Sequence, residues 1–358
     1  MTDRTLTIAE AGVNHNGDID MALELVDRAA EAGADVVKFQ TFDAERLASA
    51  AAPKAAYQDR TTGSGESQLD MLRRLELSEE GHEAVLERCK DRGIEFLSSP
   101  FDEVSLKLLI DRFGLRKIKL GSGELTNGPL LLAAARTGAE LILSTGMGTL
   151  GEIEEALGVL AYGFTRNDDP RKRSDCAATL GEPASWKVLR DQVTLLHCTT
   201  EYPAPVEEVN LRAMATMRSA FGLRVGYSDH TEGSAISLAA VALGAEIIEK
   251  HFTLDRTLPG PDHAASLEPS ELAHLVSGIR AIETALGSGI KQPGLAELPN
   301  RSVARKSLHA ARDLSAGTTI ETADLAVLRP GDGASPMEFW DWIGNSVRES
   351  IPKGNPLR

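Results

Sequence analysis

Short apolar runs alternate with longer amphipathic stretches over most of the chain, up to about residue 285. Each run is rich in β-branched residues and closes on polar residues, as a buried strand does when it ends at an exposed edge. The runs are Leu6 to Gly12, Asp35 to Thr41, Ile94 to Pro100, Lys117 to Glu124, Leu141 to Met147, Val193 to Thr199, Arg224 to His230 and Glu246 to Phe252. Helical patterns follow most of them, for instance Asp20 to Ala32, Glu103 to Phe113, Glu152 to Leu160 and Ser234 to Leu243. Eight βα units predict an α/β fold, a (β/α)8 TIM barrel rather than an open sheet.

Two segments are too long to be plain connections. They are Asp43 to Leu77, after the second predicted strand, and Gly163 to Arg190, before the sixth. The first should contain its own helix, Gln68 to Leu75. We expect such segments to act as lids or oligomer contacts, and the second could influence the choice of ligand.

The pattern changes after Leu286. A turn-rich segment from Gly287 to Gly294 predicts a linker over residues 287–299, between a barrel domain at 1–286 and a small, mainly β domain at 300–358. Within the small domain, the segments Asp313 to Ile320 and Ser350 to Leu357 share a short pattern. This weak repeat predicts two related β-turn units that pack against each other.

Charge and composition narrow the class of protein. The chain carries 38 Lys and Arg against 53 Asp and Glu, a formal net charge of −15, which argues against a nucleic acid or an anionic membrane as partner. No apolar run approaches the ~18 residues of a membrane span, and the first residues lack a signal-peptide core, so we expect a cytoplasmic protein. Three widely spaced cysteines predict neither a disulfide framework nor a structural zinc cluster. Nucleotide-binding glycine motifs are absent.

Polar residues close every predicted strand. In a TIM barrel the carboxyl ends of the strands form the active site, so these residues are the first candidates. They are Glu10 with Asn14 and His15, Lys38 and Gln40, Ser98 and Ser99, Lys119 with Ser122 and Glu124, Ser144 and Thr145, His197 and Thr199, Ser228 with Asp229 and His230, and Lys250 with His251. Because side chains alternate along a strand, residues two apart should face the barrel mouth together. The pairs expected to do so are Lys38 and Gln40, Ser122 and Glu124, and Ser228 and His230.

Cations and hydroxyls gather in this set. Lys38, Lys119, Ser99, Ser122 and Ser228 form the combination that binds a phosphate or a carboxylate, which predicts an anionic ligand inside an acidic protein. The alternative is a set of separate lysines solvated at the rim.

Two histidines close the seventh and eighth strands, which are neighbours in a barrel. His230 and His251 could together hold a divalent metal, or each could bond a backbone or carboxylate group. His197 is expected to be structural. Glu10 and Glu124 are the carboxylates best placed for acid/base work, with capping or ion-pair roles as the alternative.

Several motifs resemble those of one enzyme family. They are Ile8 to Gly17, Val37 to Gln40, Lys119 to Glu124, Leu143 to Met147, His197 to Pro203, Gly226 to Thr231, Glu249 to Thr253 and Gly260 to His263. Together they resemble the N-acetylneuraminate (sialic acid) synthases over nearly the whole chain. The tail, Ala304 to Leu308 through Leu328 to Gly331, is similar to the antifreeze-like (SAF, β-clip) domain of these enzymes.

The resemblance implies condensation of phosphoenolpyruvate with N-acetylmannosamine, or a related 2-acetamido sugar, to give a nonulosonic acid and phosphate. Legionaminic and pseudaminic acid synthases share this core and remain alternatives. So do another metal-dependent, phosphoenolpyruvate-condensing aldolase-type barrel and a non-catalytic sugar-binding protein.

The resemblance also implies residue roles. The phosphoenolpyruvate-binding residues would be Lys38, Ser99, Lys119, Ser122, Thr200 and Ser228; Thr200 stands where some members have Asn. His230 and His251 would hold a divalent ion, typically Mn²⁺, with Mg²⁺ or Co²⁺ possible. Glu10 and Glu124 would be catalytic, and Gln40, Tyr202 and Asp262 would bind the sugar. Arg329 would reach the sugar from the partner subunit of a domain-swapped homodimer.

Overall fold

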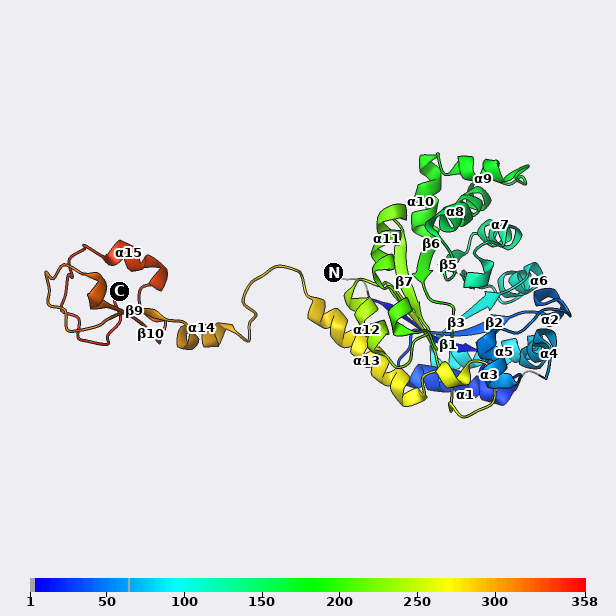
Figure 1. Ribbon diagram of the computed structural model, residues 1–358, viewed down its shortest axis with the longest axis horizontal. Coiled ribbons are helices and arrows are strands. Elements are labelled where there is room, and N and C mark those ends of the chain that lie inside the picture. The colour runs from blue at the N-terminus through cyan, green and yellow to red at the C-terminus, as the bar shows by residue number, and fades with distance from the viewer. Residues whose placement is uncertain (1–3, 64) are drawn as a thin grey trace. The chain divides into compact units, whose positions relative to one another are not determined.

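The computed structural model describes residues 4–63 and 65–358. The chain divides between Gly287 and Ser288 into two compact units. The larger, N-terminal unit contains eight parallel strands (Figure 1). They are β1 (Leu6–Gly12), β2 (Val36–Thr41), β3 (Glu95–Pro100), β4 (Lys117–Leu120), β5 (Glu140–Ser144), β6 (Val193–His197), β7 (Arg224–Asp229) and β8 (Ile247–His251). Their order is β3-β2-β1-β8-β7-β6-β5-β4, and the two end strands, β3 and β4, also contact each other. The sheet therefore closes into the predicted TIM barrel.

Every predicted strand has an observed counterpart, but five end earlier than expected, β7 and β8 by one residue and three others by two or more. The fourth was expected to run to Glu124, yet β4 stops at Leu120 and residues Ser122–Glu124 form a 3-10 turn, η2. Strands β5 and β6 end at Ser144 and His197. Ser122 and Glu124 both line the cavity described below, as predicted, but they reach it from this 3-10 turn and not by alternation along β4.

Most helices of the N-terminal unit cover the outside of the barrel, and three lie in the segment after β2. The helices are α1 (Ile19–Glu31), α2 (Ala44–Leu47), α3 (Ala56–Thr62), α4 (Gln68–Leu75), α5 (Glu79–Arg92), α6 (Glu103–Lys107), α7 (Gly128–Arg136), α8 (Leu150–Thr165), α9 (Arg173–Thr179), α10 (Pro183–Gln192), α11 (Arg212–Phe221), α12 (Ala235–Ala242) and α13 (Pro269–Leu286). The helix predicted over Glu103 to Phe113 continues past α6 as a π-helical turn, η1 (Leu108–Arg112). None of the described helices could span a membrane by length and apolar character.

Helix α1 shows how the sequence builds these elements. The Asp18 side chain accepts a hydrogen bond from the Met21 backbone N–H at 3.0 Å and so caps the first turn. Residues spaced three and four apart, among them Ala22, Leu25 and Val26, are fully buried against the barrel.

Inward-facing side chains fill the barrel in layers, of which one is apolar and the next is mostly polar. The lower layer is apolar and consists of Ile8, Val36, Leu97, Ile142, Leu196 and Ile247. The next inward positions on the same strands, two residues on, are mostly polar, for example Glu10 after Ile8 and Lys38 after Val36. The barrel is thus a packed core below and a polar site above.

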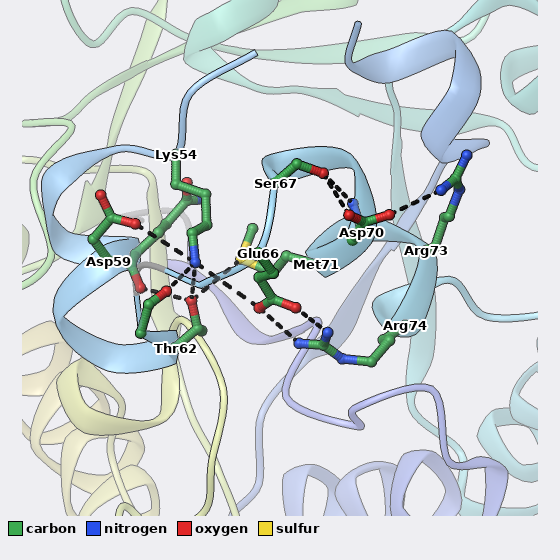
Figure 2. A network of polar contacts seen from close by, with 11 residues as sticks. Lys54, Asp59, Thr62, Glu66, Ser67, Asp70, Met71, Arg73 and Arg74 are labelled. Atoms are coloured by element: carbon green, nitrogen blue, oxygen red, sulfur yellow. Dashed lines mark hydrogen bonds and ion pairs between the residues drawn. The ribbon is translucent and has the colours of Figure 1, made fainter. Parts of the chain in front are cut away.

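The segment after β2 carries α2, α3 and α4 and is called the lid below (residues 43–77). Its helix α4 has the predicted bounds. Figure 2 shows a polar network inside it, centred on the Lys54 ammonium. Lys54 donates to Thr62 Oγ1 at 3.0 Å and to the Gly63 carbonyl, and lies 3.5 Å from Asp59 Oδ1.

The C-terminal unit contains the antiparallel strands β9 (Ser307–Ala310) and β10 (Leu325–Leu328), together with α14 (Leu298–Ala304) and α15 (Phe339–Trp342). Three further antiparallel bridges extend the β structure, one of them between Leu314 and Ile351. These two residues exchange backbone hydrogen bonds of 2.8 and 2.7 Å. The two segments predicted to pair from the weak repeat therefore lie against each other.

Candidate active site

A cavity of about 420 Å³ opens at the carboxyl ends of the barrel strands. Thirteen of the fourteen residues predicted for the site line it: Glu10, Lys38, Gln40, Ser99, Lys119, Ser122, Glu124, Thr200, Tyr202, Ser228, His230, His251 and Asp262. The fourteenth, Arg329, follows β10 in the C-terminal unit and is exposed. The structure thus brings together residues that span more than 250 positions of the N-terminal unit.

Other polar residues at or near the strand ends do not line the cavity and instead form hydrogen bonds to the surrounding backbone. Ser98 bonds the Phe39 carbonyl, and Thr145 bonds the Leu196 carbonyl. Asn14 donates to the Phe252 carbonyl. His197 bonds the Val209 carbonyl at 2.6 Å and faces away from the cavity, which agrees with the structural role expected for it. Only about half of the polar residues at the strand ends reach the cavity.

Two lysines and two carboxylates form the floor of the cavity, and all four are buried. Lys38 Nζ lies 2.7 Å from Glu10 Oε2 and 3.5 Å from Glu249 Oε2. Lys119 Nζ lies 3.5 Å from Glu249 Oε1, and Ser228 donates a 2.7 Å hydrogen bond to the same atom. Each lysine therefore faces a carboxylate while it points into the cavity.

Glu249 was missed by the sequence reasoning, which treated β8 as the source of Lys250 and His251. A signal for it exists, because Glu249 precedes His251 by two residues and alternation aims both side chains inward. By the same rule Lys250 points outward, where its ammonium lies 3.1 Å from the buried carboxylate of Asp229.

The pKa values of the two floor carboxylates shift in opposite directions. Burial raises the pKa of Glu10 to about 7, against the lowering effect of the Lys38 charge. It also acts to raise the pKa of Glu249, but Lys119 and Lys38 outweigh it and hold that pKa below its usual range. Glu10 can therefore exchange a proton near neutral pH, while Glu249 stays ionised.

The His230 and His251 rings lie side by side, with centroids 5.6 Å apart. His230 Nδ1 donates to the Thr199 carbonyl at 2.6 Å, because a carbonyl only accepts, so Nε2 of this ring carries the lone pair and lies 3.3 Å from the Ser228 hydroxyl. His251 Nδ1 is buried without a hydrogen-bond partner in the described chain and lies 4.0 Å from Asp262 Oδ2. Burial lowers the pKa of His230 to about 4 and that of His251 below its usual range, so both rings are neutral.

This arrangement fits a divalent ion held by two protein ligands. Neutral imidazole nitrogens are common ligands of such an ion, and Nδ1 of His251 is costly to bury without a partner. No group of three or more His, Cys, Asp or Glu suited to a metal occurs among the described residues. Water and substrate oxygens would therefore complete the coordination.

Hydroxyl and backbone groups line the cavity beside Lys119. Ser122 Oγ accepts a 3.0 Å hydrogen bond from the Gly146 N–H, and Thr200 Oγ1 is buried nearby without a partner in the described chain. A Cβ at Gly146 would collide with the Ser122 and Thr200 hydroxyls. Glycine is required here because two hydroxyls crowd the backbone.

Apolar side chains line another part of the cavity, which the sequence reasoning did not anticipate. Val13, Leu47, Met71, Leu72, Leu75 and Phe101 form this surface, called the apolar wall below. Three of them come from one helix, α4, and Leu47 comes from α2, so most of the wall belongs to the lid. The second long segment, residues 163–190, contributes no described residue to the cavity.

Comparisons with known proteins agree with this architecture. The NeuB family model matches residues 25–291, and the SAF domain model matches residues 305–358. The chain is 47% identical over 355 residues to the N,N'-diacetyllegionaminic acid synthase of Campylobacter jejuni, covering 99% of both chains. It is 45% identical over 350 residues to the synthase of that name from Legionella pneumophila, covering 98% of this chain and 92% of the relative. A crystal structure of the N-acetylneuraminic acid (sialic acid) synthetase from Leptospira borgpetersenii in complex with citrate superimposes with a TM-score of 0.67 at 33% identity, covering 84% of this chain and 90% of that one.

Proposed function

Because the chain belongs to the NeuB family, we propose that it condenses phosphoenolpyruvate with a hexose that carries two acetamido groups. The products would be an N,N'-diacetyllegionaminic-type nonulosonic acid and free phosphate. The identities of 47% and 45% to synthases of that name favour this substrate over the N-acetylmannosamine expected first, since the sialic acid synthetase structure is 33% identical.

The observation that carries the proposal is the convergence of the floor and the two histidines in one cavity. The Lys38 and Lys119 ammoniums, with the hydroxyls of Ser99 and Ser122, suit the phosphate and carboxylate of phosphoenolpyruvate. His230 and His251 line the same cavity, so a sugar aldehyde could lie between the anion and the rings.

The proposed reaction forms one carbon–carbon bond, and at C2 of phosphoenolpyruvate it replaces the carbon–oxygen bond to phosphate by one to a water oxygen. The enol carbon of phosphoenolpyruvate attacks C1 of the open-chain sugar, whose aldehyde oxygen takes up a proton. Water then adds to the resulting oxocarbenium carbon and gives up a proton, and phosphate leaves. Glu10, whose pKa lies near 7, can give or take these protons, a role worth about 10²- to 10⁴-fold in rate.

The remaining lining residues would orient the sugar. The Tyr202 ring lies 4.2 Å from the His230 ring by centroids. Glu124 accepts a 2.6 Å hydrogen bond from the Asn127 amide, which fixes its carboxylate, and burial raises its pKa. Burial raises the pKa of Asp262 to about 6. Gln40 completes the polar side of the sugar site.

A divalent ion, most simply Mn²⁺, is proposed at His230 and His251. When bound there it would polarise the sugar aldehyde and make C1 more electrophilic.

We also propose that Arg329 completes the site across a homodimer. It precedes Pro330 and Gly331 in the C-terminal unit, and its side chain is exposed. An exposed guanidinium can bind sugar hydroxyls or a carboxylate through several donors at once.

Phosphate release tests the proposed function. Metal-replete protein is incubated with phosphoenolpyruvate and either a diacetamido hexose or N-acetylmannosamine, and inorganic phosphate is followed with time. We expect release only when both substrates are present, faster with the diacetamido sugar. If neither sugar leads to phosphate release, the proposal is overturned.

A further inference from the structure

The outward faces of β7 and β8 end in a buried ion pair that the proposed reaction does not use. Earlier outward positions on these strands are apolar, among them Val225 on β7 and Ile248 on β8. Asp229 and Lys250 follow; they are paired in the strand register, each is 1% exposed, and the ammonium lies 3.1 Å from the carboxylate. Apolar side chains of similar volume often stabilise such a contact as well as a buried ion pair does. Stability alone therefore does not account for charges at this position.

Hydrogen bonds of this pair surround His230. Asp229 Oδ1 accepts hydrogen bonds from the Thr231 backbone N–H at 2.9 Å and from Thr231 Oγ1 at 2.8 Å. The Lys250 ammonium donates to the Thr231 carbonyl. The residues immediately before and after His230 are thus both bonded to the residue immediately before His251. Asp229, Thr231 and Lys250 are called the clamp below.

The clamp acts where the backbone pairing of the two strands stops. The register of β7 with β8 ends at Asp229 and Lys250, and His230 lies one residue beyond the end of β7. His251, in contrast, lies within β8 and is paired with Glu10 of β1. The barrel therefore fixes the position of His251, whereas that of His230 depends on contacts made after the strand has ended.

Other contacts of His230 lead toward β6. Its ring Nδ1 donates to the Thr199 carbonyl, and its own carbonyl accepts a 2.8 Å hydrogen bond from the Ala204 N–H. These bonds orient the ring relative to the loop after β6. The clamp relates the backbone on both sides of His230 to β8, on which His251 stands.

We propose that Lys250 is a positioning residue of the metal site. Through the clamp it sets the separation of the His230 and His251 imidazoles, whose centroids lie 5.6 Å apart, so that both can bind one divalent ion. Bonds from nitrogen to such an ion tolerate deviations of only about 0.2 Å, so a small displacement of His230 costs a ligand. Lys250 does not line the cavity and acts only through the histidines. This inference rests on the metal site of the proposed function.

The double variant Asp229→Asn with Lys250→Met tests this inference. It removes both charges together, so neither is left buried without its partner, and it breaks the bond from residue 250 to the Thr231 carbonyl. Mn²⁺ binding to the variant and to the wild type is measured by calorimetry on the full chain without substrates. We expect the affinity to fall about 10- to 100-fold, as is usual when residues that orient metal ligands are lost.

Two further measurements on the double variant separate positioning from general damage. The affinity for phosphoenolpyruvate should stay unchanged, because Lys38 and Lys119 lie on other strands. Phosphate release at saturating substrates should recover when the Mn²⁺ concentration is raised, because the variant lowers occupancy of the metal site and leaves the floor intact.

A matched pair of single variants keeps the test valid if the double variant does not fold. Thr231→Val and Ser237→Ala each remove one hydroxyl that donates to Asp229, at 2.8 and 2.5 Å, and both residues are fully buried. Thr231 adjoins His230, whereas Ser237 belongs to α12 and lies outside the clamp. Thr231→Val should lower the Mn²⁺ affinity, by less than the double variant does. Ser237→Ala should lower the free energy of unfolding in urea and leave the Mn²⁺ affinity unchanged.

The outcomes separate this inference from the proposed function. Mn²⁺ affinity equal to that of the wild type in the folded double variant or in Thr231→Val would overturn the role of Lys250 and leave the metal site intact. Equal losses of affinity in Thr231→Val and Ser237→Ala, or a parallel loss of phosphoenolpyruvate affinity, would also overturn it, because general loosening would explain them. Absence of Mn²⁺ binding to the wild type would overturn the proposed metal site itself.

Discussion

The floor and the apolar wall enclose one cavity but are built differently. The floor stands on strands whose backbones are hydrogen-bonded to neighbours on both sides. Lys38 pairs with Glu10 on the adjacent strand, and Lys119 pairs with Glu249 across the barrel. The wall stands mainly on short helices of the lid, which side-chain contacts around Lys54 hold together. The barrel thus fixes the distances between the charged groups. A connecting segment, in contrast, forms the part of the cavity whose shape must suit the ligand.

The largest effect should come from breaking the floor at its histidines. His251→Ala removes the orphaned imidazole nitrogen and half of the proposed metal site, so we expect turnover to fall by at least about 10³-fold. Binding of Mn²⁺, followed by calorimetry on the protein without substrates, should be lost at the same time. Retained activity in metal-stripped buffer would contradict the assignment.

Two controls accompany this variant. His197→Ala removes a histidine that faces away from the cavity and should keep both metal binding and turnover. Mixing His251→Ala with an inactive Arg329→Ala variant should restore activity if each site uses an arginine from the other subunit. Two inactive proteins that stay inactive after subunit exchange would argue against the swapped homodimer.

Loosening the wall should have a smaller and more selective effect. Lys54→Ala leaves the Gly63 carbonyl without this donor and the Glu66 carboxylate with Arg74 as its ion-pair partner, so the lid should lose order while the floor is untouched. We expect KM for the sugar to rise about tenfold, equivalent to about 1.4 kcal/mol, with little change in kcat or in binding of phosphoenolpyruvate.

Arg73→Ala is the matched control for this change. Arg73 belongs to the same network in Figure 2, but its ion pairs are exposed and worth at most about 1 kcal/mol. If both variants raised KM for the sugar equally, the buried position of Lys54 would not be the cause.

Low pH should destabilise the loop after β1, on which the lid packs. This should be the smallest of the predicted effects. His15 lies in the loop after β1 on which α4 packs, and burial lowers its pKa to about 4. Between pH 6.5 and 4 the unfolded chain binds a proton at this residue that the folded chain does not, so the free energy of unfolding should fall as the pH is lowered through this window. Above pH 6.5 the contribution is constant.

Urea unfolding at pH 7.5 and pH 5 measures this slope in the wild type and in His15→Asn. Other buried histidines titrate in the same direction, so the variant should lose only the part due to His15, at most about 1.4 kcal/mol per pH unit. An identical slope in both proteins would show that His15 is not a source of acid sensitivity.

Much of this architecture could be predicted because it follows from local periodicity. The eight strands were located because each is a short apolar run with a polar end, and helix α4 was located to the residue. The strand ends were less predictable: Ser122 and Glu124 reach the cavity from a 3-10 turn, not by alternation along β4. Glu249 could have been found from its spacing to His251, since alternation is a property of the chain alone.

The sequence by itself determined the barrel, the small C-terminal unit and the residue types that converge on the cavity, because strand and helix periods are local and the closed barrel then brings all strand ends together. Only the tertiary structure decided which carboxylate faces which lysine, that the partner of Lys250 is Asp229, and that the lid rather than residues 163–190 contributes the apolar wall. These facts depend on how segments distant in the chain pack in space, and hydrophobic packing is non-directional, so no local pattern records them.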